Sequence, residues 1–537
     1  MLVAQLLVWL NSAITLSALF TCPEMTNCAC GEETDWWLNE WTNVKVVNCS
    51  YRALTRIPNL SLLTDTPFHR LLLNNNNITD IRRDDFKNIS VKEIVLRKNP
   101  MKRIPHDSFQ EVRHVLEILD LDSDRITIDE GLRFLHGLYK LKVLDLGYNR
   151  LKNEYDEFPS EVFANANLSS LTTLTLQALQ TTKIHDGAFS GIENLEQLDL
   201  SYNFISDFPS ELRKLKNLQG LKLYSNELTS IKNNTFAGLK KLKKLLIGVN
   251  EITADSIELG AFNDLADSIE EINFYQNPLM RVPSEVLQNL KNLKKLSLVK
   301  TNLESVENGS FVGDYKLEEL HLDDNPKLRF EDDGSLNGIE DSLQVLFIRR
   351  LNLDALPLNV LGRLGSLYYL DGAENLFTKI DKHFFNGLNL SNIKLMWNKI
   401  KHVDHRAFMK MDKGVILDLH GNDIHDVSFI LQNEECFFQE VYLTKNKIPC
   451  DCSVEKVINS GVVSWQVIGE CYVETSGSKR WYSFDDTKLM GHFGKVCNKT
   501  RTYSKCFQST SGSGRQCLFN LIYFFICVIL SRTILKI

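Results

Sequence analysis

The sequence lacks cysteine over most of its length. Of the 12 cysteines in 537 residues, none lies between Cys49 and Cys436. All of them lie towards the two ends, which favours disulfide bonds that close the ends of a folded region. Paired zinc ligands prefer at least two intervening residues, so the C-x-C pairs at 28–30 and 450–452 do not favour zinc.

The chain also lacks a large net charge and recognisable enzyme motifs. Its net charge of −7 provides no positive footprint, so nucleic-acid binding is not expected. No G-x-S-x-G motif, phosphate-binding loop or activated nucleophile stands out, and His402 and His405 fall in a turn where polar residues are ordinary. We therefore expect no enzyme, no catalytic residues, no metal site and no cofactor.

A full-length membrane-spanning run is missing as well. Residues 1–20 are apolar and resemble a secretory signal peptide, although the usual positive charge is absent. Near the C-terminus, the apolar stretch 517–530 is shorter than the roughly 20 residues of a spanning helix. A GPI-anchor signal, a short membrane span and the packed helix of a secreted form remain open, and none leaves a cytoplasmic domain.

Leucine, by contrast, recurs at a fixed period. Residues 141–151 and 195–205 match L-x-x-L-x-L-x-x-N-x-L at every position. The first position occurs sixteen times from Phe68 to Phe438, mostly 23 to 25 residues apart, and a step of 30 before Leu171 indicates an inserted loop. Alternating leucines predict a short strand with one buried face, which must stack on its neighbours.

Asparagine takes the ninth position of most repeats. An inward-pointing amide has two donors and an acceptor, so it can satisfy backbone groups where the chain leaves each strand. Asp124, Leu179, Thr301 and Leu351 replace it in four repeats, and we predict local irregularity near the two leucines. The other twelve repeats predict a ladder of Asn76, Asn99, Asn149, Asn203, Asn226, Asn250, Asn277, Asn325, Asn375, Asn398, Asn422 and Asn446.

This pattern resembles the leucine-rich repeat family over roughly residues 44–500. The resemblance implies an α/β leucine-rich repeat solenoid, curved as a horseshoe. A parallel sheet would line its concave face, with irregular, 3-10 or short helical segments on the convex side. Residues 22–58 and the segment "NKIPCDC" (446–452) are similar to the caps of extracellular members. They imply the disulfides Cys22–Cys30, Cys28–Cys49 and Cys450–Cys471, and Cys452 with Cys497 or Cys506.

We therefore expect six segments. They are a signal peptide (1–20), an N-terminal cap (21–60), sixteen repeats (61–448), a C-terminal cap (449–508), a linker (509–516) and a hydrophobic tail (517–537). Nine Asn-x-Ser/Thr sequons agree with a secreted glycoprotein. Their asparagines are Asn48, Asn59, Asn77, Asn88, Asn167, Asn233, Asn308, Asn389 and Asn498.

The concave surface offers charges and aromatic side chains. The pairs Lys243-Lys244, Glu270-Glu271, Lys294-Lys295 and Glu318-Glu319 recur in consecutive repeats, which predicts mutual neutralisation in an in-register sheet. Aromatic residues near the strand ends are candidate anchors for a protein ligand, unless they only pack against long neighbours. These are Tyr148, Tyr202, Tyr224, Tyr275 and Trp397.

Together these features predict an extracellular leucine-rich repeat glycoprotein that is tethered to the cell surface and binds an extracellular or cell-surface protein. By repeat type, caps and tail it resembles adhesion proteins and co-receptors of the chaoptin, connectin and Nogo receptor type. The alternative is a secreted matrix component, a carrier or a non-catalytic subunit. The ligand is not predicted, because repeats specify the scaffold and leave specificity to surface positions.

Overall fold

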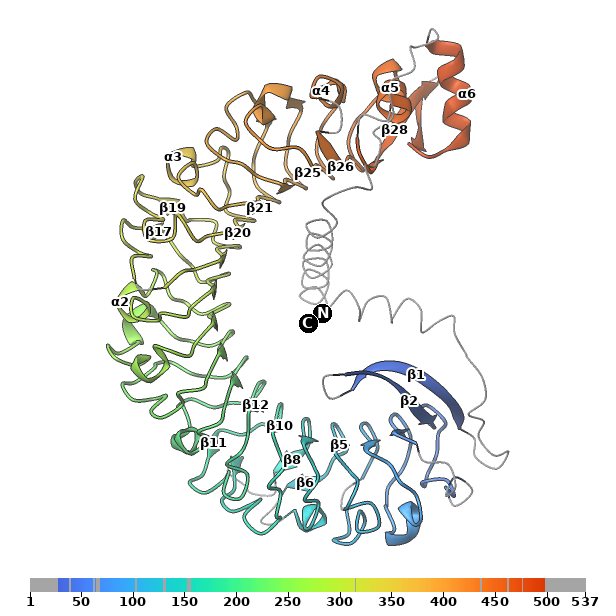
Figure 1. Ribbon diagram of the computed structural model, residues 1–537, viewed down its shortest axis with the longest axis vertical. Helices are drawn as coiled ribbons and strands as arrows, with labels where there is room; N and C mark the ends of the chain where they lie inside the picture. Colours follow the sequence, from blue (N-terminus) through green and yellow to red (C-terminus); the bar gives the residue numbers. More distant parts are fainter. Residues whose placement is uncertain are drawn as a thin grey trace. The chain divides into compact units, whose positions relative to one another are not determined.

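The structure, a computed structural model, describes residues 28–37, 40–60, 63, 68–101, 104–128, 132–151, 156–313, 315–434, 437–460, 463–475 and 477–497 (Figure 1). The predicted signal peptide, linker and tail lie outside these residues, as do Cys22, Cys436, Cys506 and Asn498. The described chain forms two compact units, unit 1 up to Glu227 and unit 2 from Leu228. Each is a leucine-rich repeat solenoid, as the sequence predicts.

The sheet of unit 1 takes one short parallel strand from each repeat. Leu71 pairs with Ile94, and this row of buried side chains continues through Leu144 to Leu221. A strand of three residues buries little by itself, so stacking supplies the core. The strands are β3 (Arg70–Leu72), β4 (Glu93–Val95), β5 (Ile118–Asp120), β7 (Val143–Asp145), β10 (Thr173–Thr175), β12 (Gln197–Asp199) and β13 (Gly220–Lys222).

An antiparallel hairpin covers the first repeat of unit 1. Strands β1 (Ala29–Trp37) and β2 (Glu40–Asn48) pair along their whole length, and the end of β2 pairs in parallel with β3. A disulfide between Cys28 and Cys49 closes its base. This hairpin has no counterpart in the repeat pattern, and the sequence did not predict it.

Unit 2 continues the same construction. The central row runs from Leu245 through Leu320 to Val441 and Val467, so the last strand lies beyond the predicted repeats, within the predicted cap. The strands are β14 (Lys244–Leu246), β15 (Glu271–Asn273), β16 (Lys295–Ser297), β18 (Glu319–His321), β20 (Val345–Phe347), β21 (Tyr369–Asp371), β23 (Asn392–Lys394), β25 (Val415–Asp418), β26 (Phe438–Tyr442) and β27 (Gln466–Ile468).

The C-terminal cap of unit 2 combines two helices with a hairpin. Helices α5 (Cys452–Ser460) and α6 (Thr487–Val496) flank the antiparallel strands β28 (Glu470–Thr475) and β29 (Ser478–Ser483). Disulfides join Cys450 to Cys471 and Cys452 to Cys497. The first bond ties the hairpin to the segment that follows the last repeat, and the second joins the start of α5 to the end of α6.

Short elements cover the side of each unit opposite the long sheet (Figure 1). Aromatic rings pack beneath them, with centroids 5.5 Å apart for Phe86 and Phe109 and 5.6 Å for Phe385 and Phe408. The 3-10 helices are η2 (Arg83–Phe86), η3 (Arg133–Leu135), η4 (Ser210–Lys214), η5 (Ala254–Ser256), η6 (Asn263–Leu265) and η7 (His405–Phe408), and the short α-helices are α2 (Ser284–Leu287), α3 (Leu358–Leu361) and α4 (Ser428–Leu431).

Two-residue strands pair between neighbouring repeats beyond the ladder turns. These pairs are β6 (Thr127–Ile128) with β8 (Arg150–Leu151), β9 (Glu157–Phe158) with β11 (Lys183–Ile184), β17 (Ser305–Val306) with β19 (Arg329–Phe330), and β22 (Lys379–Ile380) with β24 (His402–Val403). In the described part of the chain, no helix combines the length and the apolar character needed to cross a bilayer.

The predicted strand irregularity near Leu179 and Leu351 is wrong. Strands β10 and β20 pair in the same register as their neighbours, and both leucines are buried. The difference lies in the turn, because the residues on both sides of each leucine have positive φ, as they do at Asp124 and Thr301. At the asparagine positions the described residue that follows does not.

This altered turn explains why the strands stay regular. Both the Leu179 and the Thr181 N–H donate to Asn203 Oδ1 in the next repeat, at 2.9 and 3.1 Å. Leu351 and Leu353 donate to Asn375 Oδ1 in the same way. The asparagines that follow Leu179, Thr301 and Leu351 therefore each accept two backbone N–H groups.

Candidate protein-binding face

The asparagine ladder fixes the turns at the strand ends. In unit 1, Asn203 Nδ2 donates to the carbonyls of Leu176 at 3.0 Å and Leu200 at 2.9 Å. In unit 2, Asn325 makes the equivalent bonds to Leu298 and Leu322. All twelve predicted asparagines are buried. Because each amide links two repeats, the solvent-facing side of the strands and the turn residues directly after them, here termed the strand face, is held in place by buried bonds.

Three of the predicted aromatic residues lie on the strand face of unit 1. Tyr148 is 49% exposed, while Tyr202 and Tyr224 are partly buried with ring centroids 5.8 Å apart. Tyr148 and Tyr202 have positive φ, and the Tyr202 N–H donates to the Tyr224 carbonyl at 2.7 Å. The pair Tyr202–Tyr224 therefore packs mutually, whereas Tyr148 presents an open ring.

Carboxylates surround these tyrosines. Asp120 and Asp145 are opposite each other on adjacent strands, and Asp199 follows one strand beyond Thr175. The Oδ1 atom of Asp145 accepts the Gly147 N–H at 2.9 Å, and no cation pairs with this side chain among the described residues. Burial, with the added repulsion of Asp120, Asp122 and Asp199, raises the pKa of Asp145 to about 7.

The strand face of unit 2 pairs its charges instead. Lys243 contacts Glu270 at 3.0 Å, and Lys244 contacts Glu271 at 2.8 Å. The next two strands repeat this arrangement, with Lys294–Glu318 at 3.4 Å and Lys295–Glu319 at 2.7 Å. The predicted neutralisation is confirmed, because each lysine of the block contacts a glutamate on an adjacent strand.

The predicted aromatic residues of unit 2 differ in exposure. Tyr275 is partly buried, and its N–H donates to Asn273 Oδ1 at 2.8 Å. Trp397 is 46% exposed, with the His420 ring 4.9 Å away and the Lys445 Nζ 4.8 Å from its ring centre. Gly421 has a φ of 70°, and a β-carbon there would lie 2.5 Å from the indole. Only glycine lets Trp397 lie flat against this turn.

A further aromatic row on unit 2 escaped the sequence analysis. The His321 ring stacks on Phe347 at 4.2 Å, and Phe347 lies 5.3 Å from Tyr369. The His321 Nε2 is 2.8 Å from Glu319 Oε1, and although burial opposes it, this contact together with Lys295 lowers the pKa of Glu319 to about 2. Aromatic side chains at positions three and five of the repeat were the available signal. The prediction considered only the aromatic residues near the strand ends.

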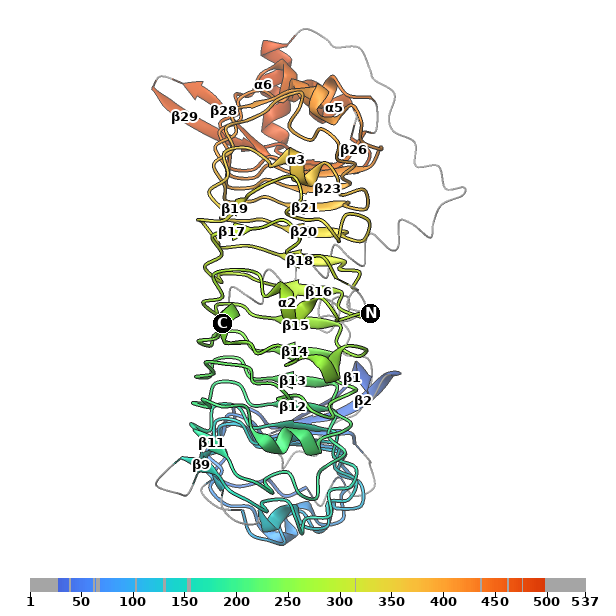
Figure 2. The same cartoon turned by 90° about the vertical axis from the view of Figure 1, so that its left-hand side faces the viewer.

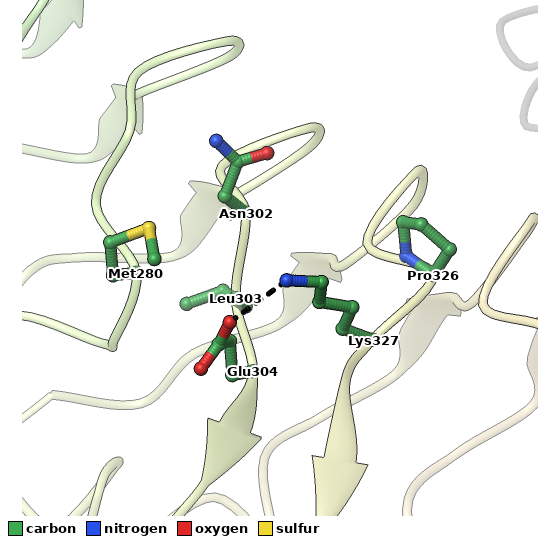
Figure 3. Close-up of a pocket in the computed structure, with 6 residues that line it drawn as sticks. All are labelled: Met280, Asn302, Leu303, Glu304, Pro326 and Lys327. Atoms are coloured by element: carbon green, nitrogen blue, oxygen red, sulfur yellow. Dashed lines mark hydrogen bonds and ion pairs between the residues drawn. The ribbon is translucent and has the colours of Figure 1, made fainter.

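A surface pocket of about 260 Å³ lies elsewhere on unit 2, among turns that follow the strands (Figure 3). The ion pair between Lys327 and Glu304, 3.2 Å long, crosses it. None of the predicted binding residues lines it, and its two charges neutralise each other. The lining residues are Met280, Asn302, Leu303, Glu304, Pro326 and Lys327.

The remaining predicted site residues lie at the ends and on the surface. Cys30 is disulfide-bonded, and its predicted partner Cys22 is outside the described residues. Within the described chain, Cys452, Glu455 and Cys497 bring three potential metal-binding atoms together, but the two sulfurs form a disulfide and hold no thiolate.

All eight described sequon asparagines are exposed, so a glycan could be accommodated at each.

Comparisons with known proteins agree with this architecture. The "Leucine rich repeat" family model matches residues 169–228, and the "BspA type Leucine rich repeat region (6 copies)" model matches 213–331 and 366–458. Podocan of Mus musculus is 27% identical over 351 residues, which cover 61% of this chain and 55% of podocan. Chaoptin of Drosophila melanogaster is 25% identical over 273 residues, which cover 50% of this chain and 17% of chaoptin.

Among solved structures, the crystal structure of a TLR13–ssRNA13 complex superposes with a TM-score of 0.52 at 19% identity. The match covers 76% of this chain and 59% of that one, and it supports the fold alone. The chain spans about half the length of the first relatives that it matches.

Proposed function

Because the chain is a leucine-rich repeat protein of the extracellular type, we propose that it is a non-enzymatic binding protein that holds another protein against its strand face. Its role would be that of an adhesion molecule or co-receptor tethered at the cell surface. The supporting observation is the exposed ring of Tyr148, which follows Asp145 by three residues on a face fixed by the asparagine ladder. Exposed aromatic rings on rigid backbone are typical anchors of protein interfaces.

The carboxylates suggest what a partner at unit 1 would bring. Asp145 has no cationic neighbour among the described residues, whereas Asp120 contacts Arg97 at 3.8 Å and Asp199 contacts Lys222 at 3.2 Å. A partner with lysine or arginine side chains would supply the missing positive charge. Trp397 with Lys445 forms the second candidate anchor, on unit 2.

The test is a binding screen with the full chain displayed on cells and multimerised extracellular domains as probes. For a probe that binds, we expect Tyr148→Ala to weaken binding at least tenfold. Tyr139→Ala is the matched control, because Tyr139 is also exposed on unit 1 but lies in the turn before β7. Equal loss in both variants, or loss only with Tyr139→Ala, would place the interface elsewhere.

Tethering is tested separately. Release of the chain from intact cells by phosphatidylinositol-specific phospholipase C would establish a GPI anchor, and retention in the membrane fraction after this treatment would favour a short span. Secretion into the medium with the tail intact would contradict tethering and favour the secreted alternative.

A further inference from the structure

Exposed apolar side chains concentrate in the C-terminal cap of unit 2. Five large ones lie within residues 463–497, namely Trp465, Ile468, Trp481, Met490 and Val496. The preceding stretch, 228–460, is more than six times as long and exposes six, namely Leu259, Met280, Val312, Leu376, Trp397 and Met409. Clustered exposed apolar groups on a folded domain mark a contact surface.

The hairpin β28–β29 is anchored to the cap on one face, at Cys471. Cys471 is fully buried and pairs with Tyr482, and its disulfide to Cys450 fixes the hairpin to the cap. The next pair, Tyr472 and Trp481, points to the opposite face, since side chains alternate along a strand. Their rings lie 5.4 Å apart, and Trp481 is 45% exposed. Figure 2 shows the hairpin projecting sideways from the cap.

Cationic side chains lie beside the tyrosine rings on the two faces of the hairpin, Lys479 on the face of Trp481 and Arg480 on the face of Cys471. The Lys479 Nζ is 4.0 Å from the Tyr472 ring centre, and the Arg480 guanidinium is 5.3 Å from that of Tyr482. Both cations are exposed. Tryptophan and tyrosine with lysine or arginine alongside is the composition found where a protein meets the polar boundary of a bilayer, with rings at headgroup level and cations extended to the phosphates.

The charge balance of the hairpin favours lipid over a polyanion. Glu470 and Glu474 balance Lys479 and Arg480, so residues 470–483 have no net charge. A sulfated polysaccharide requires an excess of positive charge. Zwitterionic headgroups do not, and burial of the rings would supply the affinity.

The sequence brings an apolar segment within reach of this hairpin. Nineteen residues, 498–516, separate Cys497 of the cap from the stretch 517–530. In any conformation they span at most about 65 Å. A tail held in the membrane would therefore keep the cap near the bilayer surface.

We propose that the β28–β29 hairpin is a membrane-contact element, in which Tyr472 and Trp481 enter the headgroup layer of the outer leaflet and Lys479, on the same face, binds lipid phosphates. This inference rests on the proposed tethering of the chain. The tail supplies the attachment, and the hairpin determines which side of the cap lies against the bilayer.

The experiment uses the full chain reconstituted into phosphatidylcholine vesicles whose acyl chains are partly brominated, because bromine quenches tryptophan only at close range. Flotation of the vesicles reports attachment, and quenching of fluorescence reports contact. We expect the wild type to float and to be quenched. Trp481→Phe should float equally and lose at least half of the quenching, whereas Trp397→Phe, which removes an equally exposed tryptophan from the strand face, should keep it.

The outcomes separate the two proposals. Flotation with unchanged quenching in Trp481→Phe would overturn the hairpin contact and leave tethering intact. Absence of flotation would overturn both. Quenching of Trp481 emission by a soluble sulfated polysaccharide, without quenching by brominated lipid, would mean that the partner is a polyanion and that the lipid contact is wrong.

Discussion

In unit 1 the carboxylates of Asp120 and Asp145 face each other across adjacent strands, whereas in unit 2 the side chains of Lys244, Glu271 and Lys295 alternate in sign across theirs. The backbone is the same in both places, so the difference belongs to the side chains alone. Asp120 also contacts Arg97, so Asp145 is the facing carboxylate without a cation among the described residues. Paired charges stabilise register, while an unpaired charge costs stability and is available to a ligand.

The turn after each strand does not require the negative charge of the unit 1 carboxylates. Asp145 Oδ1 accepts the N–H two residues on, and in unit 2 the neutral Asn273 makes the same bond to Tyr275 at 2.8 Å. Where unit 2 has an aspartate at this position, as at Asp371, burial raises the pKa but Arg349 and Lys394 oppose that shift. The comparison shows that the turn needs an acceptor oxygen at this position, and that the negative charge of Asp145 is not needed for this bond.

The largest effect should come from the ladder that both units share. Asn325→Ala leaves the Thr301 and Leu303 N–H groups and the Leu298 and Leu322 carbonyls without their buried partner, and we expect a loss of about 4 kcal/mol. Asn203→Ala in unit 1 should cost the same. Urea unfolding measures both.

Asn277→Ala is the control for this prediction, because among the described residues Asn277 Oδ1 accepts one backbone N–H, that of Ile252, instead of two. Its loss should be smaller by about 1 kcal/mol. If Asn325→Ala lowers the free energy of unfolding no more than Asn277→Ala does, the second N–H bond to Asn325 contributes no stability.

The next effect concerns the acid that interrupts the ladder of unit 1. Asp124 is buried, its Oδ2 has no hydrogen-bond partner, and burial raises its pKa to about 9. The unfolded side chain loses its proton near pH 4, so between pH 4 and 9 the folded state binds the extra proton and stability falls as pH rises. Asp124→Asn should remove this dependence and add about 2 kcal/mol at pH 7.

Unfolding midpoints at pH 5, 7 and 9 measure this difference. The gain of Asp124→Asn over the wild type should be smallest at pH 5 and grow towards pH 9. A gain that stays constant with pH would show that Asp124 is not the titrating group.

A smaller loss is expected when the pairing of unit 2 is broken. Glu271→Lys places a third ammonium between Lys244 and Lys295, and we expect a loss of about 1.5 kcal/mol at low salt. The loss should shrink in 0.5 M salt, because these side chains are partly exposed and therefore screened. Glu271→Gln, which removes charge without reversing it, should cost less than half as much, and a salt-independent loss would contradict the electrostatic explanation.

The smallest effect has the opposite sign and lies in unit 1. Asp145→Asn keeps an acceptor for the Gly147 N–H and removes one of the facing charges, so we expect a gain of about 1 kcal/mol at pH 8. Because the pKa of Asp145 is raised to about 7, the gain should diminish below pH 7, where the folded wild type is already protonated. A loss of stability at pH 8 would mean that the facing aspartates do not repel each other in the folded protein.

The repeats could be predicted because two independent signals coincide in them. Leucine spacing fixes which residues point inward, and the buried asparagines, such as Asn277, fix where each strand ends. The ion pairs of unit 2 followed from register alone. The ring of Tyr148 was also placed on the strand face from its position in the repeat.

Other features left no such signal. The hairpin β1–β2 pairs residues 29–37 with 40–48, outside the repeat, where no period constrains the chain. The left-handed turns around Leu179 use Ala178 and Gln180, which do not reveal positive φ in a sequence as glycine would. The stack of His321 on Phe347 depends on side-chain conformation, which a strand pattern does not determine.

The double acceptance by Asn203 and Asn375 gives the ladder a tolerance to mutation with a definite limit. At Leu179 and Leu351 the N–H of the substituted residue itself donates to the amide oxygen of the following repeat and so keeps a buried partner. That rescue fails if the following repeat has lost its asparagine too. Substitutions should therefore accumulate at isolated rungs and never at two in succession, as Asp124, Leu179, Thr301 and Leu351 already show, since each is followed by an intact one. The ladder should therefore tolerate one missing asparagine but not two in consecutive repeats.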